Sequence, residues 1–155
     1  MIKNYVISLP SAVDRRQHIV EQFGREQVAF EFFDAITPDQ AMVRAQQFGL
    51  CFDAQQLTQG EFACFMSHVC LWQHMIQHNL SYIAIFEDDI HLGQDARQYL
   101  TDTSWIDKTV NIIKLECFSK RVLMKGQPIS TMDGKRQLQQ LLGANYGCAG
   151  YILSR

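Results

Sequence analysis

Three consecutive acidic residues, Glu87-Asp88-Asp89, directly follow the apolar run at 82–86. An unbroken run of β-branched and aromatic residues is typical of a buried strand. Carboxylates crowded at the end of such a strand repel one another unless they take up protons or share a cation. Ligands of open α/β sheets bind outside the carboxyl ends of the strands. The triplet therefore predicts a site for a metal-bound phosphate ligand, and a solvated acidic turn is the alternative.

The spacing within the triplet predicts different roles for its members. Glu87 and Asp89 lie two residues apart, so on an extended backbone they share a face and can address one cation, directly or through water. Asp88 then points elsewhere, for example to a sugar hydroxyl. Carboxylates together with substrate phosphates are usual ligands of Mg²⁺, and Mn²⁺ accepts the same oxygens. Such a cation neutralises charge on a departing phosphate.

The rest of the chain predicts the alternating strands and helices that would position these acids. Strands are expected at 2–9, 28–33, 82–86, 110–115 and 149–153. Helices are expected at 11–24, 39–47, 95–100 and 135–142, with an irregular excursion or hairpin at 119–134. A further helix should begin at Thr58, because Thr58 and Glu61 have the spacing of a capping box and apolar residues follow at helical spacing. This order is typical of a parallel α/β sheet.

Length and composition favour one domain, residues 1–155, with a real core: 47% of the residues are hydrophobic. The formal net charge of -2 argues against a nucleic-acid-binding protein. No apolar stretch is long enough to span a membrane, and the N-terminus has no secretory h-region. The five cysteines are odd in number and form no C-x-x-C pair, which favours reduced, mostly buried thiols in a cytoplasmic protein.

Five further residues are candidates for chemistry. Arg15 and Arg16 follow the first strand and have the planar fork that binds phosphate, although an exposed helix face is the alternative. Cys64 and His68 lie one helical turn apart, but a zinc site needs further ligands, so His68 is expected to be a core histidine or a contact in a nucleotide pocket. Glu116 is a candidate sugar contact or base, with an ion pair at a strand end as the alternative.

Four blocks of this sequence resemble glycosyltransferase family 25, the family of bacterial lipooligosaccharide galactosyltransferases. The blocks are Ser8-Leu9 with Asp14-Arg15-Arg16, then Leu57-Thr58-x-Gly60-Glu61-x-x-Cys64-x-x-Ser67-His68-x-x-x-Trp72, then Ile85-Phe86-Glu87-Asp88-Asp89-Ile90, and finally 147–154. They span nearly the whole chain in the expected order. Each block alone is a weak signal, and the combination is specific.

The resemblance implies a GT-A type, Rossmann-like α/β fold with a mostly parallel sheet flanked by helices. It implies an inverting transfer of a sugar, usually galactose from UDP-galactose, to a lipooligosaccharide or lipopolysaccharide acceptor. When the family's motif is carried over to this sequence, Asp89 is the best candidate for a ligand of Mn²⁺ or Mg²⁺, and Glu87 is the next. The nucleotide-sugar contacts carried over are Ser8, Leu9, Arg15, Arg16, Ser67, His68 and Asp88. The catalytic base is expected beyond Arg155, and Glu116 is the only candidate for it within the chain.

The chain stops at the edge of an apolar strand, at Ser154-Arg155. Members of the family continue further, so the sequence predicts a GT-A domain truncated at its C-terminus, or a domain that pairs with another chain, for instance as a homo-oligomer. The expected place is the cytoplasm, with peripheral contact at the inner face of the bacterial inner membrane. The alternatives are a non-catalytic nucleotide-binding or interaction module and a different nucleotide-dependent enzyme. The lack of a G-x-x-x-x-G-K-[ST] loop counts against the latter.

Overall fold

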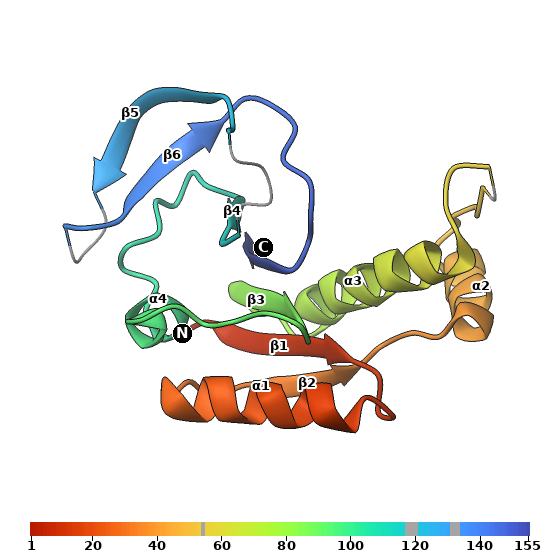
Figure 1. The fold of residues 1–155 in the computed structure, drawn as a ribbon. Coiled ribbons are helices and arrows are strands. Elements are labelled where there is room, and N and C mark those ends of the chain that lie inside the picture. The colour runs from red at the N-terminus through yellow and green to blue at the C-terminus, as the bar shows by residue number, and fades with distance from the viewer. Residues whose placement is uncertain (54, 117–120, 131–133) are drawn as a thin grey trace.

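The computed structural model describes residues 1–155 apart from 54, 117–120 and 131–133. Among the described residues, five strands form one sheet in the order β2-β1-β3-β7-β4, and β5 and β6 form a separate hairpin (Figure 1). The strands are β1 (Lys3–Ser8), β2 (Glu31–Asp34), β3 (Tyr82–Glu87), β4 (Ile112–Lys114), β5 (Met124–Ser130), β6 (Gln137–Leu141) and β7 (Gly150–Ser154). The helices are α1 (Val13–Arg25), α2 (Pro38–Gln47), α3 (Gln59–Gln77) and α4 (Ala96–Thr101).

The sheet is mixed, with a parallel part in which β1 pairs with both β2 and β3. The exception is β7, which runs antiparallel between β3 and β4. The expected α/β class with a mostly parallel sheet and flanking helices is therefore confirmed. The last strand, near the C-terminus, lies in the interior of the sheet.

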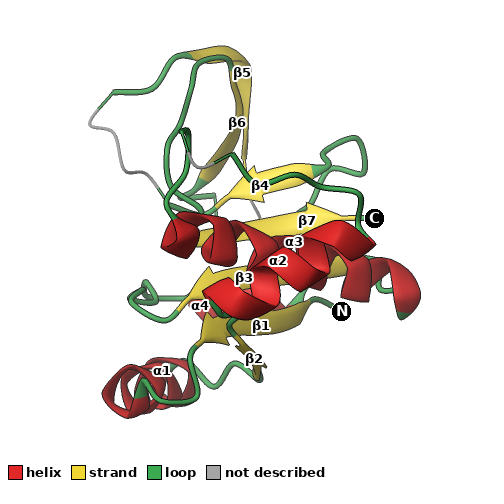
Figure 2. Ribbon diagram, turned by 90° about the vertical axis from the view of Figure 1, so that its right-hand side faces the viewer, coloured by secondary structure: helices red, strands yellow, loops and turns green. Residues whose placement is uncertain are grey.

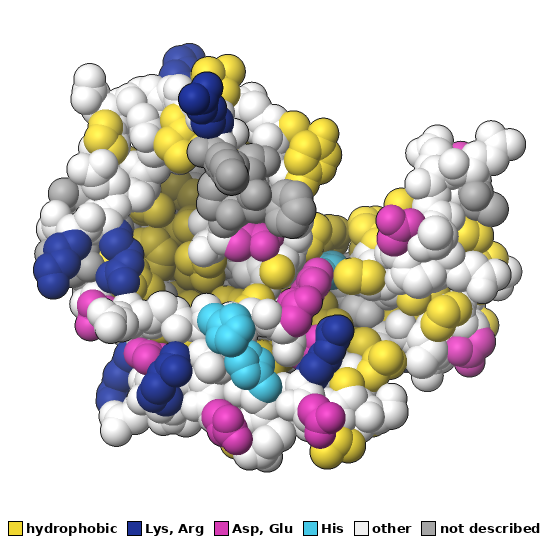
Figure 3. Space-filling view, in the orientation of Figure 1, with side chains coloured by type: hydrophobic (Ala, Val, Ile, Leu, Met, Phe, Trp, Pro, Cys, Tyr) yellow, Lys and Arg dark blue, Asp and Glu magenta, His cyan; other side chains and the backbone are white. Residues whose placement is uncertain are grey.

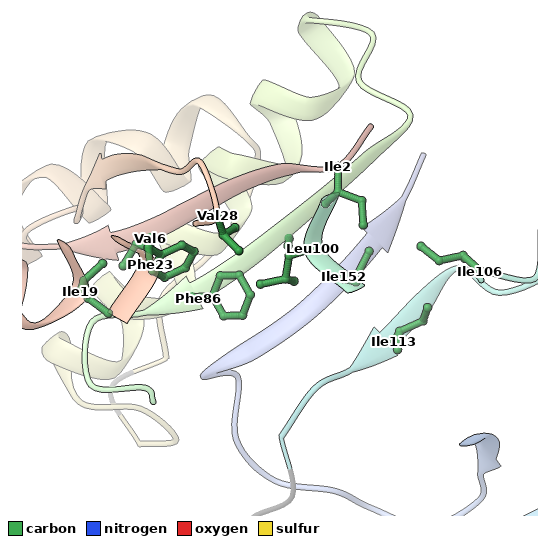
Figure 4. Packing of buried hydrophobic residues seen from close by; sticks show 11 residues of the cluster. Ile2, Val6, Ile19, Phe23, Val28, Phe86, Leu100, Ile106, Ile113 and Ile152 are labelled. Carbon is green, nitrogen blue, oxygen red and sulfur yellow. The ribbon is translucent and has the colours of Figure 1, made fainter. Parts of the chain in front are cut away.

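Side chains of β3 alternate between the two faces of the sheet, as the strand period requires. Ile83 and Ile85 pack with Leu71 and Met75 of α3. Ala84 and Phe86 face the other way, into a cluster that includes Phe23 of α1 (Figure 4). The two helices thus cover opposite faces of the sheet, and Figure 2 shows α3 crossing one of these faces. This alternation decides where the acids after β3 point.

Helix α3 begins at a capping box, as the sequence predicts. The backbone N–H of Glu61 donates to Thr58 Oγ1 at 3.2 Å, and the backbone N–H of Thr58 donates to Glu61 Oε2 at 2.8 Å. The hydrogen bonds that the backbone N–H and the hydroxyl of Thr58 donate to the Glu61 carboxylate lower the pKa of Glu61. Stability that this carboxylate contributes is therefore complete above its unfolded pKa, and it is lost as the pH falls through the lowered folded pKa.

Replacing Thr58 with alanine should lower the free energy of unfolding by about 1 kcal/mol, because the cap hydroxyl satisfies an otherwise free backbone N–H. Urea unfolding followed by circular dichroism measures this as a lower midpoint with an unchanged m-value. The matched control is Gln59→Ala at the next, exposed position, for which a change within about 0.5 kcal/mol is expected. Equal midpoints for the two variants would contradict a stabilising cap.

Some local predictions were wrong or displaced. Residues 135–142 do not form the expected helix, because 137–141 form strand β6. Strand β6 pairs with β5 in a hairpin, and a hairpin was one of the two alternatives expected for 119–134. The strand expected at 28–33 begins later, at Glu31. The cysteines in the described part of the chain are free: Cys51, Cys64, Cys70 and Cys148. The expectation that they are mostly buried is wrong, because Cys70 is partly buried and the other three residues are exposed. Cys117 lies outside the described residues.

Candidate functional site

Matching lengths of helix and strand bring His68 to the level of Glu87. Only residues 78–81 connect α3 to β3, so the chain turns back along the helix. From His68 to Gln77 the helix rises about 14 Å, at 1.5 Å per residue. From Tyr82 to Glu87 the strand rises about 17 Å in the return direction. The first half of α3 therefore lies beside the carboxyl end of β3.

Glu87 continues the face of Ile83 and Ile85 and points toward α3. Its Oε1 atom lies 3.7 Å from Nε2 of His68 and accepts a long hydrogen bond of 3.8 Å from the Cys64 thiol. Burial, followed by the negative charge of Glu87, raises the pKa of Cys64 to about 11. Cys64, His68 and Glu87 thus form one cluster.

Asp88 faces the other side of the sheet and is buried. The Ser8 hydroxyl donates to its Oδ2 at 2.7 Å, and Nη1 of Arg15 donates to its Oδ1 at 2.9 Å. The Arg15 side chain is 61% exposed, so the rest of its guanidinium can reach a ligand. Asp88 therefore joins the ends of β1 and β3 and holds Arg15 beside the triplet.

Asp89 is the exposed member of the triplet and lies in a turn, since the strand ends at Glu87. The extended backbone on which Glu87 and Asp89 were expected to share a face is therefore absent. Asp89 makes no hydrogen bond or ion pair with any residue that the structure describes. Its charge still acts on its neighbours, because it helps to raise the pKa values of Cys64 and Arg15. Its carboxylate oxygens are free to bind a cation.

Three of the residues that were predicted to contact the nucleotide sugar instead make contacts within the fold in this structure. The Ser67 hydroxyl is fully buried, accepts from the backbone N–H of Ile36 and donates to the carbonyl of Ala63. Ser8 is also buried, against Asp88. Arg16 pairs with Asp34 and lies over the Phe32 ring, 4.6 Å from its centroid. These side chains position the neighbouring elements, whereas Arg15 and Leu9 are exposed beside them.

Glu116 forms the ion pair that was the alternative to a catalytic role. Its Oε1 accepts from Lys114 Nζ at 3.0 Å and from the backbone N–H of Ala149 at 2.9 Å. It also lines a cavity of about 420 Å³ on the Phe86 side of the sheet, together with Tyr99 and Leu115. Figure 3 shows a hollow with hydrophobic walls beside the acidic side chains. The cavity is large enough for a small ligand.

The hydrogen bonds that hold the His68 ring in place were not predicted from the sequence. Its Nδ1 lies 2.9 Å from the Tyr151 hydroxyl, and that hydroxyl accepts from Nε1 of Trp72 at 2.8 Å. Burial raises the pKa of Tyr151, so the hydroxyl stays protonated. Tyr151 faces α3 because it pairs with Ile85 in the β3–β7 register. No local signal reports this, since the partners come from distant parts of the chain.

The site thus combines an α/β sheet, carboxylates at the end of a buried strand and an arginine beside them. A family model described as glycosyltransferase family 25 (LPS biosynthesis protein) matches residues 1–155. Because the match covers the whole chain, the chain belongs to glycosyltransferase family 25. The resemblance of the four sequence blocks is therefore confirmed.

Curated relatives agree with the family. The chain is 39% identical over 158 residues to the lipooligosaccharide biosynthesis protein lic2B of Haemophilus influenzae, an alignment that covers 98% of this chain and 59% of that protein. In Neisseria meningitidis serogroup B it is 36% identical to the lacto-N-neotetraose biosynthesis glycosyltransferase LgtE and 37% identical to LgtB. Those alignments cover 99% of this chain and 57% and 58% of the relatives. The chain thus spans less than three-fifths of the length of each.

Within the described residues, no helix is both long enough and apolar enough to cross a bilayer.

Proposed function

We propose that this chain is the donor-binding part of a metal-dependent, inverting glycosyltransferase that transfers galactose from UDP-galactose to a lipooligosaccharide acceptor. The observation that carries the proposal is the placement of Glu87-Asp88-Asp89 at the carboxyl end of β3, in a chain of family 25. The relatives named for lipooligosaccharide and lacto-N-neotetraose biosynthesis support the acceptor class. Such an acceptor places the reaction at the cytoplasmic face of the inner membrane.

In this proposal each acid of the site has its own role. Glu87 and Asp89 hold the cation, since both offer carboxylate oxygens at the carboxyl end of β3 and those oxygens suit Mn²⁺ or Mg²⁺. The bound cation would neutralise charge on the leaving diphosphate. Asp88 keeps Arg15 in place, and the exposed side of that guanidinium binds the diphosphate through its planar fork. Glu116 stays a weaker candidate for the base, because one of its oxygens already serves Lys114 and Ala149.

Calorimetric titration with UDP, in the presence and absence of Mn²⁺, tests the donor site. We expect binding that requires Mn²⁺, with UDP-galactose bound at least as well as UDP and more tightly than UDP-glucose. Transfer to a lipooligosaccharide acceptor is compared between this chain and a longer form that contains it. Metal-dependent binding without transfer by either form would favour the non-catalytic module. Absence of UDP binding by both forms would refute the donor site itself.

A further inference from the structure

A cluster of ligand atoms with mixed chemistry lies at the edge of the acidic triplet. The Cys64 sulfur, a ring nitrogen of His68 and a carboxylate oxygen of Glu87 all lie within 4.8 Å of one another. Two of these residues are one turn apart on α3, and the third is the last residue of β3. A thiol and an imidazole are not ligands that Mg²⁺ or Mn²⁺ prefers, whereas Zn²⁺ accepts all three types.

His68 supplies a second, independent observation. Its side chain is only 3% exposed, yet its Nε2 atom has no hydrogen-bond partner among the described residues. That atom points to Glu87 across 3.7 Å, which is too long for a hydrogen bond. A buried polar atom without a partner destabilises the folded state. A cation between Nε2 and Glu87 would give the nitrogen its missing partner.

Two of the three separations in the cluster are close to those around a tetrahedral zinc ion. Ordinary Zn–N and Zn–O bonds at a tetrahedral angle put the nitrogen and oxygen about 3.4 Å apart, and the sulfur and oxygen about 3.6 Å apart. The observed separations are 3.7 Å from His68 Nε2 to Glu87 Oε1 and 3.8 Å from Cys64 Sγ to the same oxygen. The third pair, the Cys64 sulfur and a ring nitrogen of His68, lies within 4.8 Å, against about 3.6 Å around zinc, so binding of the ion must draw these two side chains together by up to about 1 Å.

The second ring nitrogen of His68, Nδ1, also has the kind of partner that is usual for a metal-binding histidine. A histidine that binds metal usually donates its second ring N–H to an oxygen, which fixes the tautomer. Nδ1 of His68 lies 2.9 Å from the Tyr151 hydroxyl, and Trp72 holds that hydroxyl in place. When Nδ1 carries the proton and donates to Tyr151, the lone pair of Nε2 faces Cys64 and Glu87.

We propose that Cys64, His68 and Glu87 bind one Zn²⁺ ion, with the fourth position open to water. The Cys64 thiol gives its proton to solvent as the ion binds, because the thiolate is the ligand. Glu87 is then a zinc ligand, so Zn²⁺ competes with the donor-site cation for this carboxylate. Zinc binding itself does not depend on the proposed function, and it is measured without nucleotide.

Titration of the metal-free chain with Co²⁺, a coloured substitute for Zn²⁺, tests the site. We expect a thiolate-to-cobalt charge-transfer band that saturates at one ion per chain and disappears when Zn²⁺ is added. Cys64→Ser should abolish the band, and both Cys64→Ser and Glu87→Gln should weaken Zn²⁺ binding at least about ten-fold. The control is Cys70→Ser, which removes another thiol of α3 and should leave the band unchanged.

A further variant separates a metal-positioning role of Tyr151 from a structural one. Tyr151→Phe keeps the ring and removes the hydroxyl, and it should weaken Zn²⁺ binding about 10- to 100-fold in a chain that circular dichroism shows to be folded. Loss of stability with unchanged Zn²⁺ affinity would show a structural role only and would contradict the proposed outer partner. Absence of the band in the unmodified chain, or Zn²⁺ affinity that is the same in Cys64→Ser, would overturn the site.

Discussion

Asp89→Asn is expected to remove most of the Mn²⁺-dependent binding of UDP. The substitution keeps the size of the side chain and removes the charge that makes it a strong ligand for a hard cation. Loss of an outer partner of a metal ligand alone costs 10- to 100-fold in affinity, so loss of a direct ligand should cost about 100-fold or more. Calorimetric titration with UDP at saturating Mn²⁺ measures the effect. Stability should change little, because Asp89 is exposed and makes no hydrogen bond within the described chain.

The matched control is the same chemical change one residue earlier. Asp88→Asn should weaken UDP binding less than Asp89→Asn, because Asp88 acts through Arg15 and is not assigned to the cation. It should instead lower the free energy of unfolding, since it weakens the buried hydrogen bond from Ser8 and the ion pair with Arg15. Equal losses of UDP affinity in the two variants would show that the ligand assignment is wrong.

Phe23→Ala is expected to have the largest effect on stability, a loss of about 3–5 kcal/mol in the free energy of unfolding. Phe23 is fully buried, and its ring lies 4.5 Å from that of Phe30 and 5.6 Å from that of Phe86. Removing it leaves a cavity between α1 and the sheet, directly beneath the strand that ends in the acids. Urea unfolding measures the change.

Val20 provides the control on the same helix. Its side chain is 47% exposed, so Val20→Ala should change stability by less than about 0.5 kcal/mol. If Phe23→Ala is too unstable to study, Phe23→Leu should show a smaller loss of the same kind. A loss below about 1 kcal/mol for Phe23→Ala would contradict the central place of this ring in the core.

Strong local signals identified the elements that hold the acids. The apolar run before Glu87 and the capping box at Thr58 predicted β3 and α3, because burial and capping leave their pattern in adjacent residues. The segment at 135–142 failed for the opposite reason. Its glutamines, leucines and lysine favour a helix, but pairing with β5 decides its state, and pairing of strands overrides local propensity.

The site itself was only partly readable from the sequence. The helical spacing of Cys64 and His68 suggests a pair of metal ligands, but the neighbouring sequence offers no further ligand for a zinc site. The third candidate, Glu87, comes from the next strand, and only the matched lengths of α3 and β3 bring it level with them. Tyr151 lies in an expected strand, but no role is predicted for its side chain, because its link to His68 depends on the antiparallel insertion of β7. Contacts of this kind follow from topology, which residue patterns do not encode locally.

The insertion of β7 between β3 and β4 also has a consequence for synthesis on the ribosome. At about 5–20 residues per second, residues 88–149 take roughly 3–12 s to translate after β3 has been made. Throughout that time the nascent β3 has one unpaired edge, and such edges invite pairing with other chains. His68 likewise has no Tyr151 hydroxyl to pair with until β7 has been made. The sheet therefore becomes continuous in the same step in which Tyr151 reaches His68.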